Sequence, residues 1–269
     1  MPSRQVCLDT EGSFTIAVAP DGRNRGAPEP MNVAVISDIH GFSLALDEVM
    51  ADIDRQPGID AIVAAGDLCE GGPDPVGVIQ RLTDRNITCI RGNTDRDIAA
   101  GARSSNAAIW VTRQLGKDGL DFLKRLPFDH RITPPGGIPG ADDLLVVHAN
   151  PFDEDRHMPP WISEREAREM IGDTQAAVIA FGHIHIAYRR QIDALQLIDV
   201  SAVGNPKDED LRSKWGLCTW NEETRSWTTE LRYVEYPLDE TIAQLKDSGY
   251  PKPAKAIAKL QHASYRVTA

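Results

Sequence analysis

The chain has 269 residues, of which 41% are hydrophobic and 26% charged, and its formal net charge is -11; this composition is typical of a globular protein. No segment approaches the roughly 18 unbroken apolar residues of a membrane span, and the N-terminus lacks the basic start and apolar core of a secretory signal. The negative charge argues against a general nucleic-acid or membrane surface. It does not exclude a phosphate substrate, because bound divalent cations invert the local field.

The cysteines are widely spaced and form no C-x-x-C pair; they are Cys7, Cys69, Cys89 and Cys218. This usage is typical of reduced thiols. We therefore expect a cytoplasmic protein.

The first 30 residues differ in composition from the rest. Residues 21–30 are rich in Gly, Pro, Asn and Arg and read as a linker, while 14–19 form a short apolar run typical of a strand. Met31 directly precedes the first clear core strand. We predict an N-terminal extension or disordered linker over 1–30 and a single domain over 31–269.

From Met31 onward, strand patterns alternate with helical ones, which indicates an α/β fold. Helices are predicted over 43–54, with Ser43 as N-cap, and over 75–82, with Asp74 as N-cap and Pro75 at the first position. Two further helices are expected within 104–126. The predicted strands cover residues 32–37, 61–65, 87–90, 144–147 and 177–181.

After residue 190 the pattern changes. Residues 195–200, 215–220 and 227–236 are predicted to form an antiparallel meander with a turn at 221–225, and 241–246 and 254–261 end the chain as helices. An antiparallel edge is compatible with a dimer, but the oligomeric state stays open.

Five clusters of metal-binding residue types each follow a predicted strand. Open α/β sheets bind ligands at the carboxyl ends of their strands. A lone His is more often structural than a ligand, and Gly-Asp and Gly-Asn pairs are common turns. The ordered set is more informative than any member, because it supplies the ligands of a two-metal site: Asp38, His40, Asp67, Asn93, His148, His183 and His185.

These clusters resemble the five motifs of the calcineurin-like metallophosphoesterases, and the resemblance spans residues 32 to about 262. It is closest to the small bacterial and archaeal phosphodiesterase branch. The implied fold is a four-layer α/β/β/α sandwich with a C-terminal antiparallel region. The motifs are Ser37-Asp38-Ile39-His40-Gly41, Gly66-Asp67-Leu68, Arg91-Gly92-Asn93-Thr94-Asp95, Val147-His148-Ala149 and Gly182-His183-Ile184-His185.

The resemblance also implies roles. Asp38, His40 and His185 hold one divalent metal; Asn93, His148 and His183 hold the other; and Asp67 bridges both. The ligand types suit Mn, Fe, Zn, Co or Ni, with Mn favoured, and a hydroxide between the ions is the implied nucleophile. The expected partner is a small phosphoester substrate, without a stable nucleic-acid partner or a membrane.

Two departures from the family pattern bear on the reaction. Thr94 stands where the family usually has His, and a Thr hydroxyl is no acid near pH 7, so diesters with good leaving groups are favoured. Asp67 is followed by Leu68-Cys69-Glu70 and not by the Asp-Arg-Gly of protein phosphatases. The implied catalytic residues are Asp67, Asn93, Thr94 and, as an orienting group, Asp95.

The sequence thus predicts a metal-dependent phosphoesterase, specifically a phosphodiesterase acting on a small phosphorylated metabolite or nucleotide. Two alternatives stay open: a phosphomonoesterase or phosphoprotein phosphatase, and a non-catalytic scaffold such as the retromer subunit that resembles this family. Segments 96–140 and 150–170 are expected to set the specificity.

Overall fold

The computed structural model describes residues 7–8, 14–15 and 30–265. Strands β1 (Cys7–Leu8) and β2 (Phe14–Thr15) pair with each other in antiparallel fashion. The strand expected over 14–19 is thus present at 14–15, and 16–19 lie outside the described residues, as does most of the expected extension. The division into an extension and one domain over 31–269 stays a prediction.

The first large sheet has the strand order β12-β11-β3-β4-β5. Its strands β3 (Met31–Ile36), β4 (Ile59–Ala64) and β5 (Thr88–Cys89) are parallel, while β11 (Ser213–Asn221) and β12 (Ser226–Val234) form an antiparallel hairpin beside β3. From Val33 to Ile36, β3 is fully buried, as expected for a β-branched run covered on both faces.

The second sheet has the order β6-β7-β8-β10-β9 and contains β6 (His130–Ile132), β7 (Leu144–Val146), β8 (Val178–Phe181), β9 (Tyr188–Ile192) and β10 (Leu195–Asp199). The predicted meander is therefore wrong in one respect. Strand β10 pairs with β8 and β9, whereas β11 and β12 belong to the other sheet. The turn after β10 leads the chain from one sheet to its neighbour, and strand patterns alone do not encode that choice.

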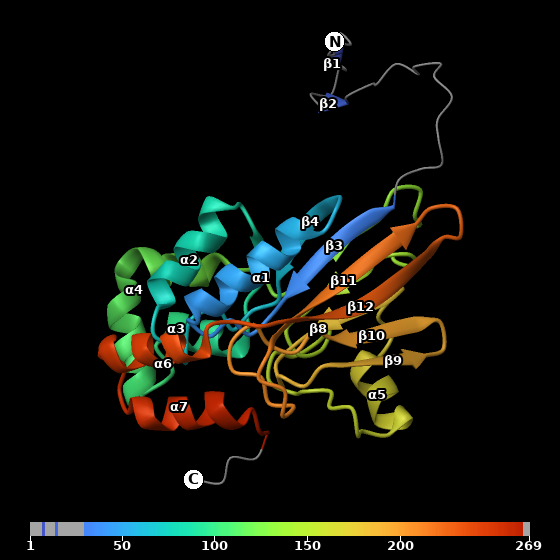
Figure 1. Ribbon diagram of the computed structural model, residues 1–269. Coiled ribbons are helices and arrows are strands. Elements are labelled where there is room, and N and C mark those ends of the chain that lie inside the picture. Colours follow the sequence, from blue (N-terminus) through green and yellow to red (C-terminus); the bar gives the residue numbers. More distant parts are fainter. Residues whose placement is uncertain (1–6, 9–13, 16–29, 266–269) are drawn as a thin grey trace.

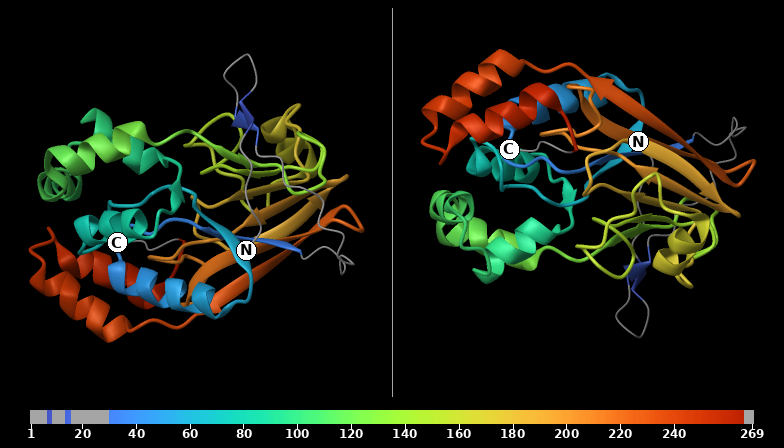
Figure 2. Two further views of the ribbon diagram at one scale, coloured as in Figure 1. Left: turned by 90° about the horizontal axis from the view of Figure 1, so that it is seen from above. Right: turned by 90° about the horizontal axis from the view of Figure 1, so that it is seen from below.

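The two sheets pack face to face and carry helices on their outer faces (Figures 1 and 2). Val33, Val63, Val146 and Ala180 belong to the apolar layer shared by the sheets. Helices α1 (Ser43–Arg55), α2 (Pro75–Asp84), α4 (Asn106–Arg125) and α6 (Leu238–Asp247) contribute to the core outside the first sheet, and α5 (Glu164–Ile171) covers the second. This arrangement confirms the four-layer α/β/β/α sandwich.

Helix ends confirm one expected cap and correct another. The Asp74 carboxylate accepts a hydrogen bond from the Gly77 N–H at 2.8 Å, and Pro75 occupies the first position of α2, as predicted. Ser43 is instead the first residue of α1, and Phe42 holds the cap position without a side-chain hydrogen bond. Gly116 interrupts α4 with non-helical φ and ψ angles, in agreement with two predicted helices.

The chain ends with α7 (Pro253–His262), which lies on the same side of the molecule as α3 (Asn93–Ala100) and α4 (Figure 1). Within residues 30–265, no helix combines the length and the apolar character that a bilayer-spanning helix needs.

Candidate metal centre

Each of the five clusters lies immediately after a strand, as predicted, and backbone hydrogen bonds bring their loops together. Asp38 N–H donates to the Gly66 carbonyl at 3.0 Å, and His40 N–H donates to the Asp67 carbonyl at 2.9 Å. The two sheets meet where His183 N–H donates to the Asp38 carboxylate at 2.7 Å. All seven predicted ligand residues thus converge between the two sheets.

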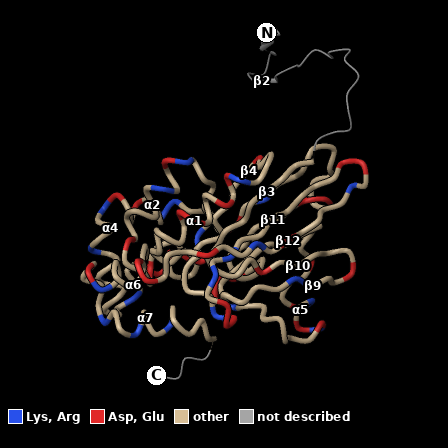
Figure 3. Tube along the Cα trace, in the orientation of Figure 1, with Lys and Arg blue, Asp and Glu red and all other residues tan. Residues whose placement is uncertain are grey.

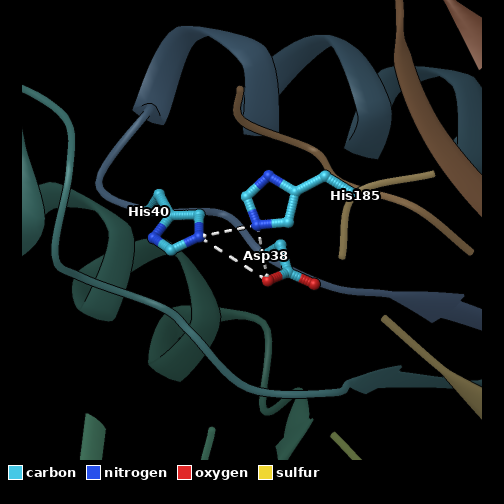
Figure 4. Close-up of side chains that lie close together, drawn as sticks. All are labelled: Asp38, His40 and His185. Atoms are coloured by element: carbon cyan, nitrogen blue, oxygen red, sulfur yellow. Dashed lines mark hydrogen bonds and ion pairs between the residues drawn. The ribbon is translucent and has the colours of Figure 1, made fainter. Parts of the chain in front are cut away.

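One group of the predicted ligand residues comprises Asp38, His40 and His185 (Figure 4). Asp38 Oδ1 lies 3.0 Å from His185 Nε2 and 3.5 Å from His40 Nε2, and the two imidazole Nε2 atoms are 3.1 Å apart. Asp38 Oδ2 accepts hydrogen bonds from the Ser37 hydroxyl and the His183 N–H, whereas Oδ1 is buried without a hydrogen-bond donor among the described residues. This free oxygen faces the two ring nitrogens.

The second group comprises Asp67, Asn93, His148 and His183. His148 Nε2 lies 3.2 Å from Asn93 Oδ1, 3.1 Å from His183 Nδ1 and 3.5 Å from Asp67 Oδ1. Asp67 Oδ2 in turn lies 3.7 Å from His40 Nε2. Asp67 is therefore the carboxylate that contacts both groups.

The outer nitrogen of each imidazole contacts a backbone carbonyl, which fixes its tautomer. His40 Nδ1 contacts the Glu70 carbonyl at 2.5 Å, His148 Nδ1 that of Ala65 at 2.8 Å and His185 Nδ1 that of Asn205 at 2.6 Å. For His183 the outer atom is Nε2, 2.9 Å from the Asp155 carbonyl.

This tautomer choice leaves a lone pair on each inner nitrogen. Two such nitrogens 3.1 Å apart repel each other unless a proton or a metal ion lies between them, and this arrangement occurs in both groups. Four imidazoles, two carboxylates and one amide with free electron pairs directed inward fit divalent first-row cations. The donor chemistry of the site therefore fits two metal ions.

The backbone of the site is strained. Asp38, His40, Asp67, His183 and His185 all have φ between 52° and 75°, a region that non-glycine residues rarely adopt. Such conformations cost about 1–3 kcal/mol each and concentrate at functional sites. Their gathering here favours a ligand-binding role over a structural one.

Comparison with known families agrees with this geometry. The family model described as calcineurin-like phosphoesterase matches residues 31–187, which is more than half of the chain. The chain belongs to this family. It is accordingly a metal-dependent phosphoric ester hydrolase.

Individual relatives support the same fold and reaction class. A metallophosphoesterase from Sphaerobacter thermophilus superposes with a TM-score of 0.68 at 24% identity, covering 87% of this chain and 99% of that one, which shows the fold. Serine/threonine-protein phosphatase 1 of Salmonella typhimurium is 25% identical over 193 residues, 64% of this chain and 87% of the relative. A symmetrical bis(5′-nucleosyl)-tetraphosphatase from an Acidovorax species is 30% identical over 158 residues, 55% of this chain and about half (52%) of the relative.

Charge coupling within this phosphoesterase site is strong. Burial opposes ionisation of Asp38, but its interactions with His185, His40 and His148 outweigh this and hold the pKa of Asp38 well below its usual value. Burial, and then the positive charge of Lys207, lowers the pKa of His185 to about 4. Burial also opposes the protonation of His40, yet the hydrogen bond to Asp38 and the charge of Asp67 raise the pKa of His40. Because metal ligands must be unprotonated, protons compete with metal ions for this site, and metal binding should weaken as the pH falls.

Asp95 and Thr94 support the ligands in different ways. The Asp95 carboxylate accepts hydrogen bonds from Leu68 N–H and Gly92 N–H, both at 3.0 Å, and so joins the loop after Asp67 to the loop before Asn93. Burial and the charge of Asp67 raise the pKa of Asp95 to about 7. Thr94 N–H donates to Asp67 Oδ1 at 2.9 Å, and the buried Thr94 hydroxyl has no partner in the described part of the chain.

A cavity of about 790 Å³ opens onto the ligands. His40, Asp67, Asn93, Thr94, His183 and His185 line one end, while Asp38 and His148 lie behind them. The remaining lining comes from Phe42, Glu70, Gly71 and residues within 103–107, 205–207 and 250–259. Of the two segments expected to set specificity, 96–140 therefore contributes and 150–170 does not.

Sequence reasoning missed several of these lining residues. Arg103 enters from the segment between α3 and α4, where its guanidinium pairs with Glu70 at 2.8 Å and with Asp97 at 3.1 Å. Lys252, Lys255 and Lys259 come from the start and body of α7. The only sequence pattern that could have indicated these lysines was their spacing along the last predicted helix. That spacing does not show which face of the helix turns toward the site.

Proposed function

We propose that the protein hydrolyses a phosphodiester or phosphoanhydride bond of a small phosphorylated metabolite or nucleotide. The observation that carries this proposal is the pairing of inward-directed imidazole nitrogens around Asp38 and Asp67. Asp38, His40 and His185 are the proposed ligands of one divalent ion, Asn93, His148 and His183 those of the other, and Asp67 contacts both. Two divalent ions held by these residues would supply positive charge for the phosphoryl oxygens and lower the pKa of the attacking water.

The chain's own residues position these parts. Backbone carbonyls orient the four imidazoles, Asp95 holds two ligand loops in register, and Asn93 and His183 face the cavity where the phosphate enters. Manganese is the ion we propose first, because carboxylate, amide and imidazole ligands all suit it.

Thr94 favours diester over monoester substrates. Thr94 lines the cavity, its buried hydroxyl has no hydrogen-bond partner among residues 30–265, and a hydroxyl cannot protonate a poor leaving group near pH 7. A leaving group that departs without protonation is therefore required, such as a nitrophenolate or the phosphate chain of a nucleotide.

Phosphomonoester hydrolysis is the second candidate, and Arg103 favours it. The phosphatase relative and the guanidinium of Arg103 in the cavity lining both suit a phosphate that carries two negative charges. Arg103 is, however, already paired with Glu70 and Asp97, so we rank the diester first.

The variant Thr94→His tests this ranking. We expect it to raise the ratio of glycerol 2-phosphate to bis(p-nitrophenyl) phosphate turnover by about tenfold or more, since an imidazole adds a general acid for the poor alkoxide leaving group of this monoester. Thr94→Ser is the matched control, because it keeps the hydroxyl and should keep the ratio. An unchanged ratio in Thr94→His would contradict the role assigned to Thr94.

A further inference from the structure

Four lysines line the cavity together with the candidate metal centre. They are Lys207, Lys252, Lys255 and Lys259. Three of them come from α7 and the residue before it, and Figure 3 marks the α7 segment with Lys positions and no Asp or Glu. Besides Asp67, the only carboxylate in the lining is Glu70, which is paired with Arg103.

These four lysines have no carboxylate within ion-pair distance in the described part of the chain. None forms an ion pair with a residue among 30–265, although the chain carries 40 Asp and Glu against 29 Lys and Arg. Lys214, by contrast, is paired with Asp208 at 2.9 Å. Lysine ammonium groups without a paired carboxylate in this part of the chain therefore collect at one cavity of an acidic protein, and they attract anions there.

These four lysines are here called the lysine wall. Contacts at both ends of α7 hold the lysine wall against the cavity. At the start of α7, the Tyr250 ring packs edge-on against Trp110 of α4, with ring centroids 5.3 Å apart. At its end, Leu260 is buried in the core, and Glu209 N–H donates to the Ala263 carbonyl at 2.7 Å, which ties α7 to the loop that carries Lys207. The fold itself therefore places the lysine wall.

From this placement we infer that the lysine wall is a second anion site, which binds a phosphate group other than the one being hydrolysed. This inference rests on the proposed function. The substrate class is then a small molecule with at least two phosphate groups, such as a nucleotide polyphosphate: one phosphate lies at the metal centre and another contacts the ammonium groups. Ammonium groups are well suited to this role, because they bind phosphate as mobile point charges and demand no fixed geometry.

The binding test uses metal-free full-length protein and inorganic tripolyphosphate, followed by calorimetry. The triple variant Lys252→Gln, Lys255→Gln, Lys259→Gln should bind tripolyphosphate at least about tenfold more weakly than the unchanged protein, because three nearby positive charges are lost. The control removes the same charge elsewhere through Lys117→Gln, Lys124→Gln and Lys246→Gln, all at exposed positions outside the cavity. It should bind tripolyphosphate as the unchanged protein does.

Equal weakening in both triple variants, or no weakening in the first, would overturn the inference. Replacement of the same three wall lysines by Arg keeps the charge and should restore binding, which separates the effect of charge from an effect on folding.

ADP and pyrophosphate, titrated in parallel, identify the source of the phosphate. Tighter binding of ADP supports a nucleotide, and equal binding supports recognition of the phosphate chain alone.

Kinetics separate this inference from the proposed function. With Mn²⁺ present, the wall variant should hydrolyse bis(p-nitrophenyl) phosphate, which has a single phosphate, with unchanged KM, while the KM for diadenosine tetraphosphate rises about tenfold. Normal hydrolysis of the simple diester together with an unchanged KM for the tetraphosphate would leave the proposed function standing and refute the second anion site.

Discussion

The variant Asp67→Asn should hydrolyse phosphodiesters at least about 1000-fold more slowly than the unchanged protein, which corresponds to roughly 4 kcal/mol of transition-state stabilisation. Asp67 is the carboxylate that lies between the two ligand groups, 3.5 Å from His148 Nε2 and 3.7 Å from His40 Nε2. An amide has the same shape but no negative charge, so it cannot hold two cations together. Steady-state hydrolysis of bis(p-nitrophenyl) phosphate measures the loss.

The fold should survive this substitution, because the Asn amide oxygen can still accept the hydrogen bond from Thr94 N–H. Circular dichroism and the thermal midpoint of the metal-free protein check that point. Asp118→Asn, an exposed carboxylate on α4, is the matched control and should keep full activity. Turnover by Asp67→Asn at the rate of the unchanged protein would refute the assignment of this carboxylate.

The variant Gly66→Ala should lose roughly 4 kcal/mol in the free energy of unfolding. Gly66 has a φ of 90°, and an added Cβ would lie 2.4 Å from the backbone nitrogen of Gly92 and 2.7 Å from the carbonyl carbon of Arg91. Both atoms belong to the backbone of the loop that presents Asn93, so relief of the clash must move a proposed ligand. Urea unfolding of metal-free protein measures the effect without a contribution from metal binding.

Gly101→Ala isolates the conformational part of that loss. Gly101 also has a positive φ, 67°, but an added Cβ there meets nothing within 4 Å. This control should cost only about 1–2 kcal/mol, the penalty of a left-handed conformation for a residue with a side chain. Equal losses in the two variants would mean that the close approach between the loops of Gly66 and Gly92 does not matter.

The parts of the site that follow strands were predictable, because strand and ligand lie next to each other in sequence. A buried apolar run predicts β3 or β8, and the polar residues that follow, such as Asp38 or His183, must then lie at the carboxyl edge of a sheet. Parallel pairing of neighbouring strands brings these edges together. The convergence of the seven proposed ligand residues could therefore be predicted without knowledge of the loops between them.

Features that depend on distant packing were not predictable. The route of β10 into the second sheet depends on its pairing with β8, and the position of α7 depends on Tyr250 meeting Trp110. The orientation of His183 depends on the carbonyl of Asp155, in a segment whose role no local pattern shows. For the same reason the positions of the lysine wall and Arg103 in the cavity lining could not be predicted from the sequence.

The central claim is that the site holds two divalent ions and needs them for phosphoester hydrolysis. The most direct test is to strip the protein of metal, add Mn²⁺ stepwise and follow hydrolysis of bis(p-nitrophenyl) phosphate. We predict no turnover in the stripped protein and a rise that levels off near two equivalents of Mn²⁺ per chain. Full turnover without metal, or no turnover of either the diester or p-nitrophenyl phosphate with Mn, Fe, Zn, Co or Ni, would contradict this account.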